Sequence, residues 1–284
     1  LRTLHRTPAR GSTILGATFT RWDRTFMSVR WLAAAWLLSI AAVSHSAYAA
    51  DVSVLTAGAF RPVLLALQPG FERQTGDHLH IGFGTAGELT RQIAGGAHFD
   101  VLIAPREALR AVAGEIQAAS VLDVARVGIG VVVRQGAPVP DVSTPEALRQ
   151  TLLAAPSIAM IDPASGGSSG PAVLAMFATL GIADAVKGRL VLKQGGAVAD
   201  LVADGHAAIG VHQISEILPV PGVVLAGALP EALQTYTTYT VALGAHPADA
   251  PAADALVAAL HGPAVAAILK GRGMQSAADF SHGR

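Results

Sequence analysis

Cysteine is absent from the 284 residues, and aromatic residues make up only 5% of them. The chain therefore forms no disulfide, offers no thiolate to a metal and has no cysteine for a lipid anchor. All three tryptophans lie in the first 50 residues, at Trp22, Trp31 and Trp36. A chain of this length needs no disulfide, because it can bury the core of one large domain or of two lobes.

Net charge is also lacking, since 20 basic residues balance 20 acidic ones. The balance is uneven along the chain: residues 51–284 hold 14 basic and 19 acidic residues, a net charge of about −5. Such a chain has no basic surface that could neutralise a phosphate backbone. We therefore expect no nucleic-acid partner.

The first 50 residues have the composition of an export leader. A short basic end at residues 27–30 precedes an apolar run at 31–43, and small residues follow at 46–50. The apolar run is too short to span a membrane, so a signal peptide over 27–50 is favoured over a retained anchor. Residues 1–26 precede a suitable start at Met27 and are interpreted as a mis-annotated extension. The predicted location is the periplasm.

From Asp51 onward, short apolar runs alternate with segments of helical periodicity. The predicted strands are 52–55, 79–83, 99–104, 157–161, 190–192, 209–213 and 237–243, and the predicted helices include 60–74, 88–94, 106–113, 172–180, 250–260 and 263–269. Strands regularly separated by helices predict an α/β fold with mostly parallel sheets covered on both faces. The apolar run at 124–133 is long enough to cross from one lobe to another.

Small-residue loops follow three of the predicted strands, at residues 56–59, 85–87 and 162–170. The carboxyl ends of parallel strands are where α/β proteins bind ligands. The third loop opens a helix, whose free N–H groups and positive dipole end favour an anion, with hydroxyls of Ser165, Ser168 and Ser169 as further donors. Arg61 follows the first loop and could face the same cleft, where a guanidinium suits a carboxylate or an oxyanion.

Enzymatic alternatives fit less well. Gly166-x-Ser168-x-Gly170 matches a hydrolase nucleophile elbow, but four residues separate it from the strand and no His-Gly-Gly sequence precedes it. A phosphate-binding P-loop requires a lysine that this loop lacks. The histidines show no metal-binding spacing beyond His78-x-His80. We expect no metal, no cofactor and no enzymatic activity, with a serine hydrolase using Ser168 as the minor alternative.

With these loops placed, residues 52–274 resemble the periplasmic molybdate-binding proteins and the related substrate-binding proteins of ABC importers. The likeness rests on VLTAGAF (54–60), FGTAGEL (83–89), FDVLI (99–103), Asp162-Pro163 with its loop, and IGV (209–211). It implies a type II periplasmic binding protein: two Rossmann-like lobes joined by two crossing hinge strands. The implied lobes are 51–130 with 238–284, and 131–237, with hinges near 128–133 and 236–241.

The resemblance also implies a ligand-binding set, although three side-chain ligands of the family are changed. Its two ligating serines fall on Ala59 and Ala86, and its ligating tyrosine falls on Gln213; Thr56 and Thr85 could replace the missing hydroxyls. Two ligand classes stay open: molybdate or tungstate, and a small organic acid or phosphorylated metabolite. The implied partner is an ABC permease, and we expect a monomer. The predicted ligand-binding residues are Thr56, Ala57, Gly58, Ala59, Arg61, Thr85, Ala86, Gly87, Ser165, Gly167, Ser168, Ser169, Gly195, Gly196 and Gln213.

Overall fold

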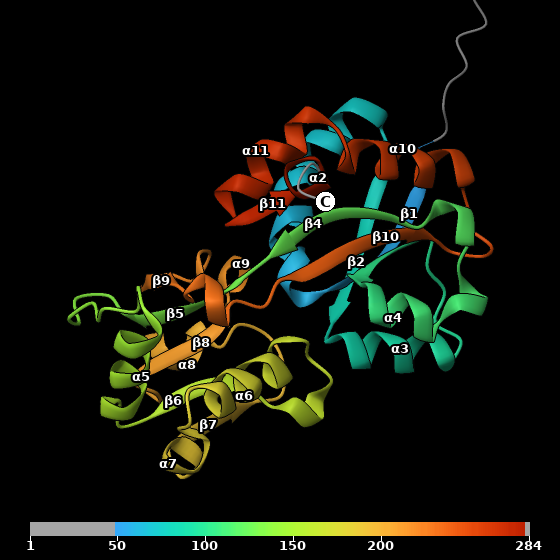
Figure 1. Ribbon diagram of the computed structural model, residues 1–284. Helices are drawn as coiled ribbons and strands as arrows, with labels where there is room; N and C mark the ends of the chain where they lie inside the picture. Colours follow the sequence, from blue (N-terminus) through green and yellow to red (C-terminus); the bar gives the residue numbers. More distant parts are fainter. Residues whose placement is uncertain (1–48, 282–284) are drawn as a thin grey trace, which may run out of the picture. The chain divides into compact units, whose positions relative to one another are not determined.

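The computed structural model describes residues 49–281. The predicted extension at 1–26 and nearly all of the predicted signal peptide at 27–50 lie outside the described residues. Two β-sheets with helices on their faces organise the described part (Figure 1).

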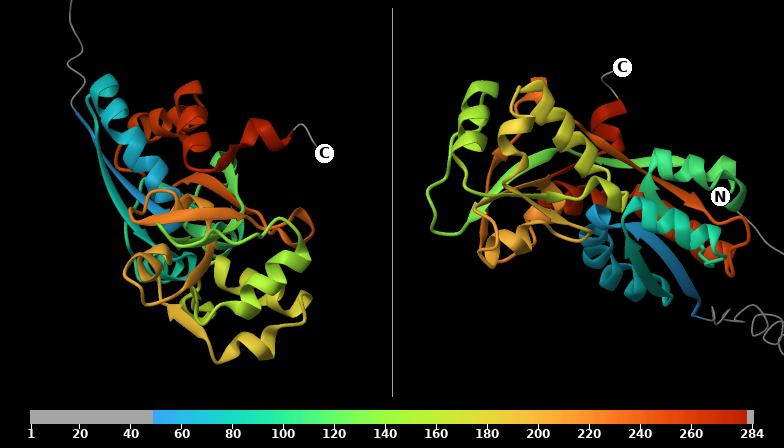
Figure 2. Two further views of the ribbon diagram at one scale, coloured as in Figure 1. Left: turned by 90° about the vertical axis from the view of Figure 1, so that its left-hand side faces the viewer. Right: turned by 90° about the horizontal axis from the view of Figure 1, so that it is seen from below.

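The first sheet has six strands in the order β11-β4-β10-β3-β1-β2. These strands are β1 (Asp51–Ala57), β2 (His78–Gly84), β3 (Val101–Pro105), β4 (Leu122–Val127), β10 (Thr237–Leu243) and β11 (Met274–Ser276). Helices α2 (Arg61–Thr75), α10 (Ala250–Leu260) and α11 (Pro263–Gly271) cover one face, and α3 (Ala86–Ala94) and α4 (Arg106–Ala111) cover the other (Figures 1 and 2). The short helix α12 (Ala277–Ser281) follows β11.

The second sheet has five strands in the order β7-β6-β8-β5-β9. These are β5 (Ile129–Arg134), β6 (Ile158–Ile161), β7 (Leu190–Lys193), β8 (Ile209–Gln213) and β9 (Val223–Ala228). The helices that accompany it are α5 (Pro145–Ala154), α6 (Ser169–Thr179), α7 (Ala183–Lys187), α8 (Ala199–Ala203) and α9 (Ile214–Ile217). Five 3₁₀ turns complete the described elements: η1 (Gly58–Phe60), η2 (Ala113–Glu115), η3 (Ala118–Ser120), η4 (Pro163–Ser165) and η5 (Glu231–Leu233).

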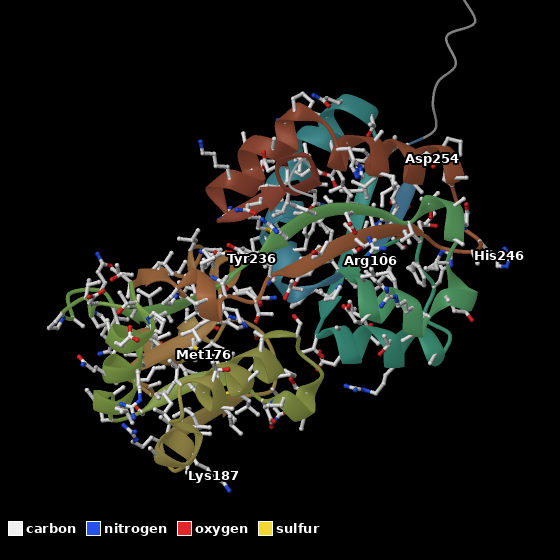
Figure 3. All side chains as sticks on the ribbon, viewed as in Figure 1. Arg106, Met176, Lys187, Tyr236, His246 and Asp254 are labelled. Carbon is white, nitrogen blue, oxygen red and sulfur yellow. The ribbon has the colours of Figure 1, made fainter. Side chains whose placement is uncertain are left out.

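Strand β5 shows why the second sheet needs helices on both faces. Side chains alternate along a strand, so a run of valines presents apolar groups to both sides. Val131 and Val133 pack in one buried cluster with Met176 of α6, whereas Val132 packs in another with Val202 of α8. Figure 3 shows Met176 among the side chains of α6.

The chain passes between the two sheets twice. It leaves β4 and enters β5 through Gly128, and it leaves β9 and enters β10 through residues 229–236. Gln234 joins the two crossings, because its Oε1 accepts from the N–H of Ile129 at 2.7 Å and its Nε2 donates to the carbonyl of the same residue at 3.0 Å. A Cβ at Gly128 would stand 2.9 Å from this amide, so the crossing is packed tightly around a glycine. That these segments act as hinges remains a prediction.

The predicted fold class is confirmed, but the expectation of mostly parallel sheets was wrong. β1 pairs in parallel with β2 and β3, and β6 with β7 and β8, whereas β10 and β5 pair antiparallel with both of their neighbours. β5 and β10 arrive from the other sheet rather than through a helical crossover, so no right-handed βαβ connection fixes their direction. The apolar run at 124–133 proves to be parts of two strands in different sheets.

No single helix within residues 49–281 is long and apolar enough to cross a membrane. Helices α10 and α11 reach the necessary length and hydropathy only as a pair bent by 59°.

Candidate ligand-binding site

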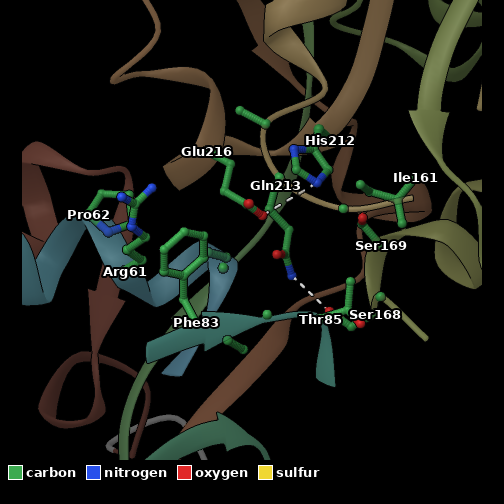
Figure 4. A pocket seen from close by; sticks show the side chains of 18 of the residues that line it. Arg61, Pro62, Phe83, Thr85, Ile161, Ser168, Ser169, His212, Gln213 and Glu216 are labelled. Carbon is green, nitrogen blue, oxygen red and sulfur yellow. Dashed lines mark hydrogen bonds and ion pairs between the residues drawn. The ribbon is translucent and has the colours of Figure 1, made fainter. Parts of the chain in front are cut away.

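A pocket of about 670 Å³ lies at the carboxyl ends of strands from both sheets (Figure 4). The first sheet contributes the residues after β1 and β2, and the second contributes those after β6, β7 and β8. Its volume is within the usual range for a small-molecule site. The lining residues are Ala57, Gly58, Ala59, Arg61, Pro62, Phe83, Gly84, Thr85, Ala86, Glu88, Pro105, Ile161, Gly167, Ser168, Ser169, Gly195, Gly196, Ala197, Asp200, His212, Gln213, Glu216, Pro219, Val220, Pro221 and Tyr239.

Most of the predicted ligand-binding residues line this pocket, and three do not. Thr56 is fully buried in β1 and its hydroxyl donates to the carbonyl of Ala57 at 3.3 Å. Ser165 is buried and its hydroxyl donates to the carbonyl of Asp162 at 2.8 Å. Gly87 is packed against Gly166, to whose carbonyl its N–H donates at 3.1 Å. The hydroxyls of Thr56 and Ser165 therefore do not face the pocket.

Thr85 lines the pocket, but its hydroxyl already has partners. It forms a capping box at the start of α3: Oγ1 accepts from the N–H of Glu88 at 3.1 Å, and Glu88 Oε2 accepts from the N–H of Thr85 at 2.7 Å. The Thr85 hydroxyl also donates to the carbonyl of Ser165 at 2.8 Å. A hydroxyl has one proton to give, so Thr85 is not free to replace the missing serine ligands.

The central loop brings the N-terminus of α6 to the pocket. Gly166 has φ +79°, a conformation that favours glycine, and a Cβ at Gly170 would stand 2.8 Å from the carbonyl oxygen of Ile161. The helix begins at Ser169, and Ser168 makes no side-chain capping bond. The N–H groups of Ser169 and Gly170 have no acceptor inside the helix, and Ser168 and Ser169 line the pocket, so this terminus is available to an anion.

Arg61 is the first residue of α2, and it lies in the pocket as the sequence predicts. Its guanidinium carbon stands 3.8 Å from the centroid of the Phe83 ring, a cation–π contact that holds the side chain over an aromatic face (Figure 4). Phe83 is 49% exposed, although it is a large apolar residue. The ion pairs within 4 Å among residues 49–281 do not include Arg61. Its charge is therefore available to a ligand.

Gln213 joins three elements of the site. Its side chain is buried at the end of β8, and its Nε2 donates to Ser168 Oγ at 3.2 Å and to Thr237 Oγ1 at 2.9 Å. Its Oε1 accepts from the hydroxyl of Tyr239 at 3.1 Å. Burial raises the pKa of Tyr239, so this hydroxyl keeps its proton. The main role of the Gln213 amide is therefore to hold Ser168, Thr237 and Tyr239 in place around the site. The partner of Ser168 is an amide rather than an imidazole, and an amide is no base for a serine hydrolase.

Two further polar residues of the pocket, His212 and Glu216, were not predicted from the sequence. His212 is 1% exposed and its Nε2 lies 3.4 Å from Glu216 Oε2, while Nδ1 has no hydrogen-bond partner among the described residues. Glu216 comes from α9 and reaches across to η1, where a Cβ at Gly58 would stand 2.9 Å from Glu216 Oε1. The available clue was the four-residue spacing of these two side chains on either side of Gln213, at a strand-to-helix junction.

Burial keeps this histidine–glutamate pair uncharged near neutral pH. Loss of solvation, with a smaller contribution from the charge of Asp200, raises the pKa of Glu216 to about 8. Loss of solvation, with a smaller contribution from the charge of Lys193, lowers the pKa of His212 to about 3. The short contact between them is therefore a contact between a neutral carboxyl and a neutral imidazole.

These two pKa values predict how stability depends on pH. Between pH 6.5 and 8 the folded protein keeps a proton on Glu216 that the unfolded chain has released, so the free energy of unfolding falls as pH rises, by about 2 kcal/mol. His212 causes the opposite loss on acidification, as pH falls from 6.5 towards 3.

Thermal melts between pH 6.5 and 8.5 test this expectation. Wild type should lose about 4–8 °C more in Tm than Glu216→Gln, which carries no titrating group at this position. Equal losses in the two proteins would show that Glu216 ionises normally.

Among residues 49–281, no group of three or more histidine and carboxylate side chains is arranged to hold a metal ion. His80 of the His78-x-His80 pair has its Nε2 2.9 Å from Asp51 Oδ1, and both side chains are well exposed. This histidine therefore belongs to a surface contact.

Two sheets joined by two chain crossings, with one pocket at the strand ends of both, define the class of type II periplasmic binding proteins. A family model described as bacterial extracellular solute-binding protein matches residues 52–275. The chain belongs to this family, as the resemblance of its loops implied.

Individual relatives agree with this family and differ in what their names say they bind. An aconitate isomerase from Pseudomonas sp. is 30% identical over 213 residues, which cover 72% of this chain and 80% of the relative. The periplasmic molybdate-binding protein of Azotobacter vinelandii has TM-score 0.65 at 20% identity and covers 78% of this chain and 98% of that one. The sulfate-binding protein SubI of Mycobacterium tuberculosis has TM-score 0.66 at 15% identity, with 82% and 91% covered.

Peb3 of Campylobacter jejuni is a further structural neighbour, with TM-score 0.62 at 16% identity, covering 79% of this chain and 99% of that one. A second structure of Peb3, with L-phospholactate bound, has TM-score 0.62 at 15% identity. At these identities the four structural likenesses show the fold. The molybdate-binding type of fold is thereby confirmed, and the ligand must be argued from the pocket.

Proposed function

We propose that this chain is an exported solute-binding protein that captures a small organic acid with two or three carboxylates. The observation that carries the proposal is the guanidinium of Arg61, which lines the pocket over Phe83 and has no acidic partner within 4 Å among the described residues. A guanidinium binds a carboxylate through two parallel hydrogen bonds, which fixes orientation as well as supplying charge.

The pocket offers few free hydroxyls for a tetrahedral oxyanion such as molybdate or tungstate. Ala59 and Ala86 line it where the resembled family has serines, and both lack a hydroxyl. The Thr85 hydroxyl donates to Ser165, and the Gln213 amide donates to Ser168 and Thr237. A single oxyanion would also fill only a small part of 670 Å³. These features favour a larger, elongated anion.

The remaining polar groups suit a carboxylate at more than one point. The N-terminus of α6 presents backbone donors on the side of the pocket that carries Ser168 and Ser169. Glu216 is protonated at neutral pH, so it does not repel an anion. Arg61 and the α6 terminus come from different sheets, which supports binding at the two ends of one ligand.

The name of the sequence relative supports this class of ligand. Aconitate, the compound in the name of the Pseudomonas relative, is an unsaturated tricarboxylate. We take trans-aconitate as the test acid for this chain.

Membership of the solute-binding family supports delivery of the ligand to an importer. We place the protein in the periplasm, as a monomer whose two sheets close about the crossings at Gly128 and residues 229–236. A closed, loaded form would present one surface to an ABC permease. Capture and delivery by themselves require no chemistry on the ligand.

Isomerisation of the bound acid is a second candidate function. The specific observation in its favour is a protonatable carboxyl, Glu216, inside the pocket of a chain that is 30% identical to an isomerase.

A dye-based thermal-shift panel tests the proposed ligand class. The panel contains molybdate, tungstate, sulfate, phosphate, malate, citrate and trans-aconitate. An acid at ~100 times its Kd should add roughly 2.7 kcal/mol, a rise in Tm of about 5–10 °C. We expect this rise with a di- or tricarboxylate. A rise with molybdate and tungstate alone would refute the proposal.

A further inference from the structure

Glu216 is placed to meet the ligand rather than only to support the fold. Both of its oxygens are located by neighbours: Oε2 stands 3.4 Å from Nε2 of His212, and Oε1 lies against the backbone of Gly58. Gly58 belongs to η1 of the first sheet, whereas Glu216 and His212 belong to α9 and β8 of the second. Figure 4 shows the carboxyl between the imidazole and the Arg61–Phe83 pair.

The environment of this carboxyl lets it exist in two protonation states. With a proton on the carboxyl, the unprotonated Nε2 of a neutral His212 can accept from it; without that proton, the other tautomer can donate to the carboxylate. Nδ1 of His212 has no partner among the described residues that would lock either tautomer. A fold that needed only a structural hydrogen bond at this place would not require an ionisable group.

We propose that Glu216 moves a proton between two carbons of the bound unsaturated acid, with Arg61 holding the neighbouring carboxylate. This inference rests on the proposed function, because it needs a carboxylic acid in the pocket. It deepens that function by assigning the site a proton-transfer reaction and a residue that performs it.

The step balances without any oxidant, reductant or metal. The Glu216 carboxylate accepts a proton from a methylene carbon next to a carboxylate, so that a C–H bond breaks and an O–H bond forms. The electron pair spreads over the adjacent C=C unit as an allylic carbanion, stabilised by the carboxylate beside the Arg61 guanidinium. The O–H of Glu216 then returns the proton to the far carbon, and the double bond has moved by one position.

Burial tunes the carboxyl for this work. The pKa of Glu216 is raised to about 8, so its carboxylate is a stronger base than an exposed one and still forms near neutral pH. The titratable groups that share its surroundings are His212 on β8, Asp200 on α8, Tyr239 on β10 and Arg61 at the start of α2. With the pKa of His212 lowered and that of Tyr239 raised, Glu216 is the group expected to control the rate between pH 6 and 9.

Proton NMR in D₂O measures the reaction. Purified protein and trans-aconitate are mixed, and the loss of the methylene and vinyl signals is followed together with the appearance of the cis isomer. Isothermal titration with the same acid reports binding independently. Wild type should bind the acid and exchange both positions, with a rate that rises as pH approaches about 8.

Three variants test whether Glu216 performs the proton transfer. Glu216→Gln keeps a neutral hydrogen-bonding group, so its Kd should stay within about threefold of wild type while exchange falls at least 100-fold. Glu216→Asp keeps a carboxyl one methylene shorter and should retain slow but measurable exchange. Asp254→Asn, on the far α10 helix, should behave as wild type (Figure 3).

Each result separates the two proposals. Tight binding without exchange in wild type overturns the proton-transfer role and leaves the binding function standing. Exchange in Glu216→Gln at the wild-type rate also overturns it. Absence of binding to wild type overturns the proposed ligand and the reaction together.

Discussion

Replacing Arg61 with alanine is expected to weaken binding of trans-aconitate by about 100-fold. The variant cannot form the charge-assisted hydrogen bonds to a carboxylate, which we value at about 2–3 kcal/mol in a partly enclosed pocket. Arg61→Lys should recover only part of the affinity, because an ammonium group keeps the charge but cannot form two parallel bonds or stack on Phe83 in the same way. Isothermal titration gives the three dissociation constants.

Arg73→Ala is the matched control, because Arg73 lies in the last turn of the same helix α2 and does not line the pocket. It should bind the acid as wild type does. Melting temperatures should change little in either alanine variant, since the interaction between Arg61 and the Phe83 ring is worth roughly 1 kcal/mol at most when partly exposed. Full affinity in Arg61→Ala would show that this guanidinium does not hold the ligand.

The largest effect on stability is expected from Gln213→Leu. Leucine has a similar size but cannot accept from the Tyr239 hydroxyl or donate to Ser168 and Thr237. Tyr239 is fully buried, so its hydroxyl would lose the acceptor on Gln213, and the free energy of unfolding should fall by about 2–4 kcal/mol. Urea unfolding curves measure the change through their midpoints.

Gln213→Glu is the control for this network. A glutamate keeps the acceptor for Tyr239 and, once protonated, has a single donor. At pH 5 Gln213→Glu should therefore lose less stability than Gln213→Leu. At pH 8 the losses in the two variants should become similar. Equal stability of Gln213→Leu and the wild-type protein would show that the three hydrogen bonds make no net contribution to the free energy of unfolding.

The sequence predicts the elements well where hydrophobic periodicity is strong. Helix α10 begins and ends as predicted at Ala250 and Leu260, and strand β8 spans Ile209 to Gln213 as predicted. Strands β9 and β11 were missed, because β9 carries only a short run after a turn and β11 has three residues. The prediction of mostly parallel sheets failed at β5 and β10, because direction depends on which sheet a strand enters and local sequence does not record it.

Part of the candidate site could also be predicted from local sequence. Small-residue loops mark the strand ends, so the pocket and Arg61 were found from local pattern. Whether a hydroxyl in that pocket is free depends on contacts between residues far apart: Thr85 donates to Ser165, 80 residues away. Glu216 escaped notice because its unusual environment arises from burial against Gly58, which sequence spacing does not reveal.

The central claim is that the pocket holds an organic acid through Arg61. The most direct measurement is isothermal titration of the purified protein with trans-aconitate, followed by the same titration in the presence of excess molybdate. The account predicts one binding site per chain, an affinity that molybdate does not reduce, and an affinity about 100-fold lower in Arg61→Ala. Binding of molybdate at one site, unaffected by Arg61→Ala and with no heat from the acid, would contradict it.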